Sequence, residues 1–178
     1  MKNIIRDVLI TVVIAVAIFF GLRAVVQSFD VDGPSMEPNF HTGERVLVNK
    51  LVYHLHPPQR GDVIVFVSPH PGQGDLIKRV MGLPGESVDI QNGKVYIHKT
   101  NGQVIALDEP YIADPARNNF TGGTIPAGQY FVLGDNRNVA DDSRYGWLVP
   151  KGSIIGKAWL LTWPPHDWGL AANYHFAQ

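Results

Sequence analysis

The apolar residues of the chain form one long run near the N-terminus and many short runs after it. Val8 to Val26 reads VLITVVIAVAIFFGLRAVV and is interrupted only by Thr11, Gly21 and Arg23. A helix of this length reaches about 28 Å at about 1.5 Å per residue, close to the hydrocarbon thickness of a bilayer. The run has no polar face, which disfavours the alternative of a buried core helix. The pattern therefore predicts a membrane-spanning helix.

Charged residues at the ends of this run predict its orientation. Lys2 and Arg6 flank the N-terminal end and, by the positive-inside tendency, place the N-terminus in the cytoplasm. Arg23 lies near the other end, where its side chain can reach the head groups. A cleaved secretory signal is the alternative, but the only small-x-small triplet near the run, at residues 15–17, lies inside it. We expect an uncleaved, single-pass anchor in a plasma membrane or an equivalent energy-transducing membrane.

After the apolar run the chain consists of short strand-like segments separated by turn residues. Asn92-Gly93 and Asn101-Gly102 each join two such segments, and Asn-Gly favours a tight hairpin because both turn positions take a positive φ. The pattern predicts a mainly β fold, an antiparallel barrel-like or two-sheet body. The expected strands are residues 45–49, 62–67, 76–81, 87–90, 94–98, 103–107, 129–133 and 153–162.

The two patterns together predict two parts of the chain. Residues 1–27 are expected to form a cytoplasmic tip and the transmembrane anchor, and residues 28–178 an extracytoplasmic β domain. Residues 87–119, which contain both Asn-Gly turns, are expected to form a hairpin-rich insertion in that domain.

Composition excludes several classes of protein. The apolar fraction of 45% excludes a mostly disordered chain, and 15 basic against 16 acidic residues give no basic footprint for nucleic acid. The absence of cysteine excludes disulfides, thiolate catalysis and Cys-ligated zinc. His54 and His56 are followed by two prolines and have no carboxylate nearby in the sequence, so we expect a loop there and no metal site.

Two stretches contain a candidate nucleophile and a candidate base. Ser35 lies in FDVDGPSMEPNF, whose Gly and Pro also fit an ordinary turn. In DLIKRVMGLPGE, strand alternation puts Lys78 on the face of Leu76 and Val80, with Arg79 pointing the other way. An ammonium on an apolar face loses hydration, which lowers its pKa from about 10.4 and lets the neutral amine accept a serine proton. The alternative is a lysine at a strand edge that extends to solvent.

A third stretch, GDNRNVADDSRYG at residues 134–146, contains several acidic and several basic residues. Its three Asp and two Arg fit either a polar turn or a charge-assisted network. Asp142 with Arg144 is a plausible pair that orients a neighbouring site.

Taken in order, the three stretches resemble the type I signal peptidase (leader peptidase) family of membrane-anchored serine proteases. The resemblance spans the chain from the apolar run to about Lys157. It implies the removal of signal peptides from exported preproteins at small-x-small sites, with no metal or organic cofactor, and with the preproteins and the lipid bilayer as partners. The matching residues are Gly33-Pro34-Ser35-Met36-x-Pro38, Gly74-Asp75-x-Ile77-Lys78-Arg79-Val80 with Gly82-x-Pro84-Gly85-Glu86, and Gly134-Asp135-Asn136-Arg137 with Asp142-Ser143-Arg144.

The resemblance also implies a role for individual residues. Ser35 attacks the peptide carbonyl and Lys78 is the general base. A substrate strand adds beside residues 76–78. Shallow apolar pockets for small substrate side chains are lined by Phe29, Val31, Met36, Leu76 and Ile77, and the supporting positions are Gly33, Arg79, Ala140, Asp142, Ser143 and Arg144.

Two positions depart from the pattern of some family members. Gly33 stands where a serine can donate to the oxyanion, so the Ser35 backbone N–H is expected to be the main donor. Ala140 stands where a serine commonly hydrogen-bonds the lysine, a loss of about 1–3 kcal/mol that water, Asp142 or Ser143 can offset. Two alternatives follow: a weakly active or inactive homologue that binds signal peptides, and a Ser-Lys protease with a single dedicated substrate.

Overall fold

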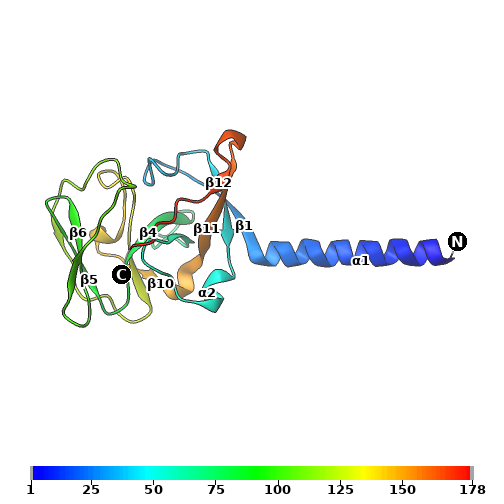
Figure 1. The fold of residues 1–178 in the computed structure, drawn as a ribbon, viewed down its shortest axis with the longest axis horizontal. Helices are drawn as coiled ribbons and strands as arrows, with labels where there is room; N and C mark the ends of the chain where they lie inside the picture. The colour runs from blue at the N-terminus through cyan, green and yellow to red at the C-terminus, as the bar shows by residue number, and fades with distance from the viewer. Residues whose placement is uncertain (1, 177–178) are drawn as a thin grey trace.

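A computed structural model describes residues 2–176 as one long helix joined to a β body (Figure 1). Helix α1 (Lys2–Val25) projects away from that body. Its segment Ile4–Gly21 is long and apolar enough to cross a membrane, and none of it is buried. The alternative of a buried core helix is therefore wrong. The helix begins before the expected Val8, and Val26 begins a strand instead of ending the helix.

The larger of the two sheets has eight strands. Its strands follow the order β1-β2-β11-β3-β4-β9-β10, with β12 paired to β11, and all of these pairings are antiparallel. The short helix α2 (Val52–Leu55) lies between β2 and β3. The strands are β1 (Val26–Asp30), β2 (Arg45–Asn49), β3 (Val63–Phe66), β4 (Leu76–Gly82), β9 (Gln129–Leu133), β10 (Val149–Pro150), β11 (Ile154–Trp163) and β12 (Gly169–Leu170).

The smaller sheet lies at the end of the body away from α1 (Figure 1). It has the order β7-β6-β5-β8 and is also antiparallel. The expectation of a mainly β, antiparallel fold with an N-terminal apolar helix is confirmed. The strands are β5 (Ser87–Gln91), β6 (Lys94–His98), β7 (Val104–Ala106) and β8 (Phe120–Thr121).

The two Asn-Gly sequences form different turns. Asn92 and Gly93 both have positive φ, 50° and 80°, and join β5 to β6 as a tight hairpin, as expected. At Asn101-Gly102 only the glycine has a positive φ, 83°. There the Lys99 N–H donates to the Gln103 carbonyl across a three-residue loop, so a two-residue turn is wrong. A type I turn that ends in a left-handed glycine accounts for this loop.

Strand β4 is the central element for the site. It lies between β3 and β9, and six of its seven residues are buried. Residues on its two faces pack into different apolar clusters. Ile77 packs with Val31 and Met36, whereas Val80 packs with Ile64. Both faces of β4 are therefore covered by the body, and a polar side chain on either face is dehydrated.

Candidate active site

The fold brings Ser35 and Lys78 into contact across 43 residues of sequence. Ser35 lies in the turn that follows β1, and Lys78 lies in β4. The Lys78 ammonium donates a hydrogen bond to Ser35 Oγ at 2.8 Å and a second one to the Ile77 carbonyl at 3.0 Å. The two residues that the sequence separated are therefore within proton-transfer distance.

Lys78 is a dehydrated amine. Its exposed fraction is 3%, so the alternative of a lysine that extends to solvent is wrong. Burial lowers the pKa of Lys78 to about 8, although the charges of Asp142, Asp141 and Asp135 act to raise it. A pKa near 8 leaves a useful fraction of neutral amine close to physiological pH.

The turn that contains Ser35 is held against the third motif, residues 134–146, by its backbone. The Asn136 N–H donates to the Ser35 carbonyl at 3.1 Å. A Cβ on Gly134 would lie 2.5 Å from that carbonyl oxygen and 2.2 Å from the Cβ of Ala140, so only glycine fits there. Gly33, with φ +82°, permits the turn before Ser35. Within residues 2–176 no acceptor takes the Ser35 N–H, which leaves this donor available to an oxyanion.

Asp142 and Ser143 are engaged elsewhere than at the lysine. Asp142 accepts hydrogen bonds from the Gly134 N–H at 3.1 Å and from Arg144 Nε and Nη2 at 2.7 and 2.8 Å. Ser143 Oγ accepts from the Val132 N–H at 2.9 Å. The expected Asp142–Arg144 pair is present, but the expectation that Asp142 or Ser143 replaces the missing serine is wrong. The Ile77 carbonyl takes the second lysine hydrogen bond instead.

Ala140 is buried beside the Ser35 carbonyl, and a hydroxyl at this position is expected to improve the site. We expect Ala140→Ser to raise kcat/KM by about two- to tenfold, because one neutral hydrogen bond contributes about 0.5–1.5 kcal/mol. Initial rates of preprotein cleavage measure the gain. Ala116→Ser adds the same hydroxyl at a buried alanine of a third apolar cluster, which contains Val95 and Ile97, and is the matched control. An unchanged or lower rate in Ala140→Ser would mean that the Ile77 carbonyl already holds the amine well.

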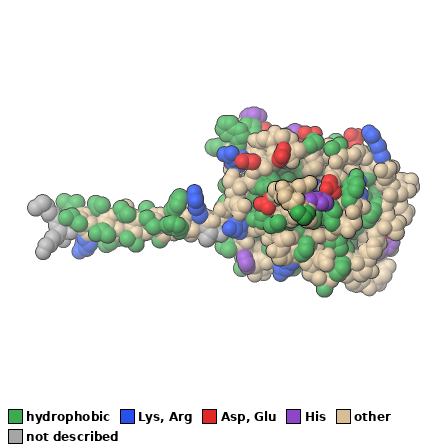
Figure 2. Space-filling model, turned by 180° about the vertical axis from the view of Figure 1, so that it is seen from behind, with side chains coloured by type: hydrophobic (Ala, Val, Ile, Leu, Met, Phe, Trp, Pro, Cys, Tyr) green, Lys and Arg blue, Asp and Glu red, His purple; other side chains and the backbone are tan. Residues whose placement is uncertain are grey.

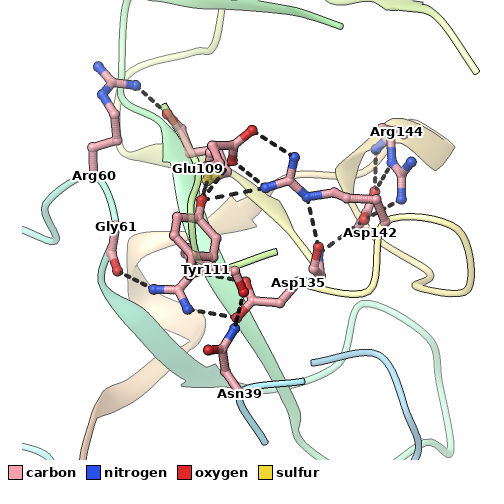
Figure 3. Close-up of polar contacts among 12 residues, drawn as sticks. Asn39, Arg60, Gly61, Glu109, Tyr111, Asp135, Asp142 and Arg144 are labelled. Atoms are coloured by element: carbon pink, nitrogen blue, oxygen red, sulfur yellow. Dashed lines mark hydrogen bonds and ion pairs between the residues drawn. The ribbon is translucent and has the colours of Figure 1, made fainter. Parts of the chain in front are cut away.

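Arg79, the residue after Lys78, organises a buried network, whose members Gly61, Tyr111 and Asp135 are labelled in Figure 3. Its guanidinium forms two hydrogen bonds with Asp135, at 2.8 and 2.6 Å, and both side chains are fully buried. Asp135 also accepts from Asn39 Nδ2 at 2.8 Å. The guanidinium further donates to the carbonyls of Gly61 and Ala172 and lies 4.1 Å from the centre of the Tyr111 ring. The network joins β4 to the nucleophile turn and to the third motif.

A second buried arginine extends this network. Arg137 pairs with Glu109, with Nη1 3.0 Å from Oε2, and its Nε donates to the Gly134 carbonyl at 3.1 Å. The Tyr111 hydroxyl donates to Glu109 at 2.6 Å, and burial together with the Glu109 charge raises the pKa of Tyr111, so it stays protonated. Sequence reasoning missed Asn39, Glu109 and Tyr111. The sequence indicated them only indirectly, through Arg79, because a buried arginine requires side chains that accept its hydrogen bonds and balance its charge.

The five residues expected to line the substrate pockets fall into two groups. Val31, Met36 and Ile77 are buried in one cluster, with Phe29 packed against it. Leu76 packs instead against the cluster of Ile64 and Val80. Met36 is fully buried, so its side chain has no surface that a bound peptide could contact in this structure.

One edge of β4 has no strand partner beside the dyad. On one side β3 pairs with the whole of Leu76 to Arg79. On the other side β9 pairs only from Arg79 onward. Among the described strands, none therefore covers the second edge of residues 76–78, and an extended peptide can add there.

The histidines give no metal site. Within residues 2–176 no group of three or more possible metal-ligating side chains comes together. His54 lies in the short helix α2, and His56 follows that helix directly. The expected loop is therefore in part a short helix at His54.

Comparisons with known proteins show that the chain is related to peptidases. It belongs to the family described as signal peptidase, peptidase S26, whose model matches residues 3–163. A probable signal peptidase I-1 of Synechocystis is 42% identical over 82% of this chain and 76% of its own length. Signal peptidase I of Leptolyngbya laminosa is 38% identical over 89% and 80% of the two chains. A crystal structure of a signal peptidase I from Enterococcus faecalis is 38% identical, covers 56% of this chain and 95% of its own, and has a TM-score of 0.49.

Proposed function

We propose that this chain removes N-terminal signal peptides from exported preproteins at small-x-small sites, with Ser35 as the nucleophile and Lys78 as the general base. The observation that carries the proposal is the 2.8 Å contact between Lys78 Nζ and Ser35 Oγ in a dehydrated setting. Membership of the signal peptidase family supports the substrate class.

The geometry supports a two-step acyl transfer. Neutral Lys78 accepts the Ser35 proton as Oγ bonds to the scissile carbonyl carbon, and the Ser35 N–H donates to the developing oxyanion. The ammonium then gives its proton to the leaving amine of the mature protein. In the second step Lys78 takes a proton from water, the resulting hydroxide attacks the ester, and Ser35 recovers its proton as the signal peptide leaves. Lys78 is the base in both steps, and the leaving amine of the substrate takes the proton that Lys78 releases in the first.

The open edge of β4 supports an extended binding mode for the signal peptide. A peptide strand beside residues 76–78 forms main-chain hydrogen bonds there and directs alternate side chains toward the same surface. Phe29, packed against the cluster of Val31 and Ile77, and Leu76, packed against the cluster of Ile64 and Val80, both remain partly exposed. The proposed small-x-small preference requires the sites for alternate substrate side chains to be shallow.

The helix α1 supports a site held at the membrane surface. We propose that the part of the chain up to Val25 forms the cytoplasmic tip and anchor, and that the extracytoplasmic catalytic domain begins with β1 at Val26 instead of at the expected residue 28. Exposed hydrophobic side chains gather on the part of the body nearest α1 (Figure 2), and those of β11 and β12 are Trp159, Trp163 and Leu170. Ser35 follows Val25 by ten residues, so it stays within about 35 Å of the helix end. Enzyme and signal peptide then meet in two dimensions, which raises their effective concentration.

Cleavage of a defined preprotein tests this function. Full-length protein in lipid vesicles is expected to cut a preprotein with an Ala-x-Ala site, and mass spectrometry will place the cut directly after the second alanine. Replacing both alanines of the substrate by leucine is expected to lower kcat/KM at least about thirtyfold, because overfilling shallow pockets at two positions costs about 1–3 kcal/mol each. Binding of the preprotein without any cleavage would favour the inactive homologue instead. Equal cleavage of both substrates would contradict the proposed specificity.

A further inference from the structure

A small polar pocket of about 240 Å³ lies next to the turn that contains Ser35. Ala140 is one of its lining residues, and its Cβ lies 2.2 Å from the point that a Cβ on Gly134 would occupy. The Ser35 carbonyl oxygen lies 2.5 Å from the same point. The pocket therefore begins directly beside the backbone of Ser35. Its other lining residues are Arg117, Asn118, Arg137, Asn138, Arg144 and Tyr145.

Two segments of the chain form the walls of this pocket and are joined by side-chain contacts. One wall is the third motif, and the other belongs to the segment between β7 and β8. Asn138 Oδ1 accepts a hydrogen bond from the Arg117 N–H at 3.0 Å, and Asn138 Nδ2 donates to the Pro115 carbonyl at 3.1 Å. The ion pair of Arg137 with Glu109 links the same two segments a second time. The pocket is therefore fixed by the contacts of the fold.

One of the three arginines in this pocket has no acidic partner. Arg137 is paired with Glu109, and Arg144 with Asp142 (Figure 3). Arg117 is exposed, and within residues 2–176 no carboxylate pairs with it. The charges around the pocket therefore leave one cation unmatched.

Other donors of the pocket are also unoccupied. Arg144 uses Nε and Nη2 for Asp142, and among the described residues its Nη1 has no acceptor, although this atom is accessible. In the same part of the chain the Asn118 amide and the Tyr145 hydroxyl make no side-chain hydrogen bond, and both residues are exposed. A carboxylate matches this set, because arginine binds carboxylates in a planar geometry and a cationic ligand would meet like charge. The volume holds an acidic side chain with several waters, since one water takes about 30 Å³.

We propose that this pocket binds an acidic side chain among the first three residues of the mature protein, and that Arg117 sets this preference. The inference rests on the proposed function, because it requires a preprotein to be cut at Ser35. The proposed signal-peptide surface on β1 and the start of β4 shares no residue with the pocket. A peptide whose signal part lies on that surface continues past Ser35 with its mature part. Three extended residues reach about 10 Å, so a pocket beside Ser35 lies within their range.

Paired preproteins test this inference. Full-length protein in phosphatidylcholine vesicles is given substrates with an Ala-x-Ala site and either Glu or Gln at the first, second or third position after the cut. At one of these positions we expect Glu to give about three- to fivefold higher kcat/KM than Gln, the upper range for a partly exposed ion pair. Arg117→Gln should bring this ratio to about one. Arg117→Glu should reverse the preference, so that Lys at that position is cut faster than Glu.

The controls separate charge recognition from a loss of structure. Arg117 contacts Asn138 through its backbone N–H, so both substitutions leave that contact in place. Lys94→Gln removes an exposed cation of β6 and should keep the wild-type ratio of Glu to Gln. A merely structural role of Arg117 would change kcat/KM for both substrates by the same factor, and that result would overturn the inference.

The outcomes also separate this inference from the proposed function. Equal cleavage of the Glu and Gln preproteins at all three positions, by an enzyme that Ser35→Ala inactivates, would remove this inference alone. A Glu preference that persists in Arg117→Gln would assign the recognition to another site and overturn it as well. Cleavage retained in Ser35→Ala would remove the proposed function and this inference together.

Discussion

Replacing Lys78 by methionine is expected to lower kcat/KM for preprotein cleavage by about 10²- to 10⁴-fold, the usual contribution of a general base. Methionine keeps the length and the apolar stem of the side chain, so it fits the buried position in β4. It removes the group that contacts Ser35 Oγ at 2.8 Å. Without an acceptor for its proton, the serine hydroxyl stays a poor nucleophile. Single-turnover cleavage of the preprotein, followed by gel or mass spectrometry, measures the loss.

The pH profile of the wild-type enzyme gives a second readout of the same residue. Since burial lowers the pKa of Lys78 to about 8, the active neutral amine accumulates as the pH rises through that value. At pH 7 only about one tenth of the amine is neutral, so kcat/KM should rise roughly tenfold between pH 7 and pH 9. We expect this rise to disappear in Lys78→Met.

Two variants make the result specific. Ser35→Ala should fall to a similar floor, because it removes the nucleophile itself. Lys94→Met removes an exposed lysine of β6 and should leave the rate unchanged. A Lys78→Met enzyme with wild-type activity, or a wild-type limb well below pH 7, would mean that another group takes the serine proton.

The sequence predicted the strands that carry a clear local signal. Residues 45–49, 94–98 and 129–133 alternate or are strongly β-branched and aromatic, and they match β2, β6 and β9 residue for residue. The missed strands were β1, β8, β10 and β12. Three of these have two residues each, too few to show a period, and β1 follows the apolar run without a turn signal. Their pairing depends on partners far away in the sequence, which no local pattern shows.

The dyad and its surroundings differ in how far the sequence could predict them. Alternation placed Lys78 among apolar neighbours, and the burial of β4 agrees with the dehydrated amine. The same rule directed Arg79 to the opposite face of the strand. Both faces of β4 are covered by the body, so Arg79 is buried as well. Its partners include the Gly61 and Ala172 backbone carbonyls, and backbone groups leave no trace in residue identity.

Replacing Asp135 by asparagine is expected to destabilise the folded protein by about 3–5 kcal/mol, because it leaves the Arg79 guanidinium charged, buried and without an anion. Both side chains of this pair have no exposed surface. For a protein of this size the loss corresponds to a fall in the unfolding midpoint of about 6–20 °C. Thermal unfolding of the full-length protein in detergent, followed by circular dichroism, measures the shift. Asp30→Asn removes one partner of an exposed pair with Arg45 and should leave the midpoint unchanged.

Stability and positioning are separable at this network. Exchanging both partners for apolar residues, Arg79→Met with Asp135→Leu, removes the unpaired charge and should restore part of the lost midpoint, because buried pairs contribute little net stability. The double variant still lacks the acceptor for Asn39 in the nucleophile turn. We therefore expect kcat/KM to stay at least about tenfold below wild type at temperatures where the variant is folded, since small displacements of a reacting group are costly. Recovery of activity together with stability would mean that the buried pair serves folding alone.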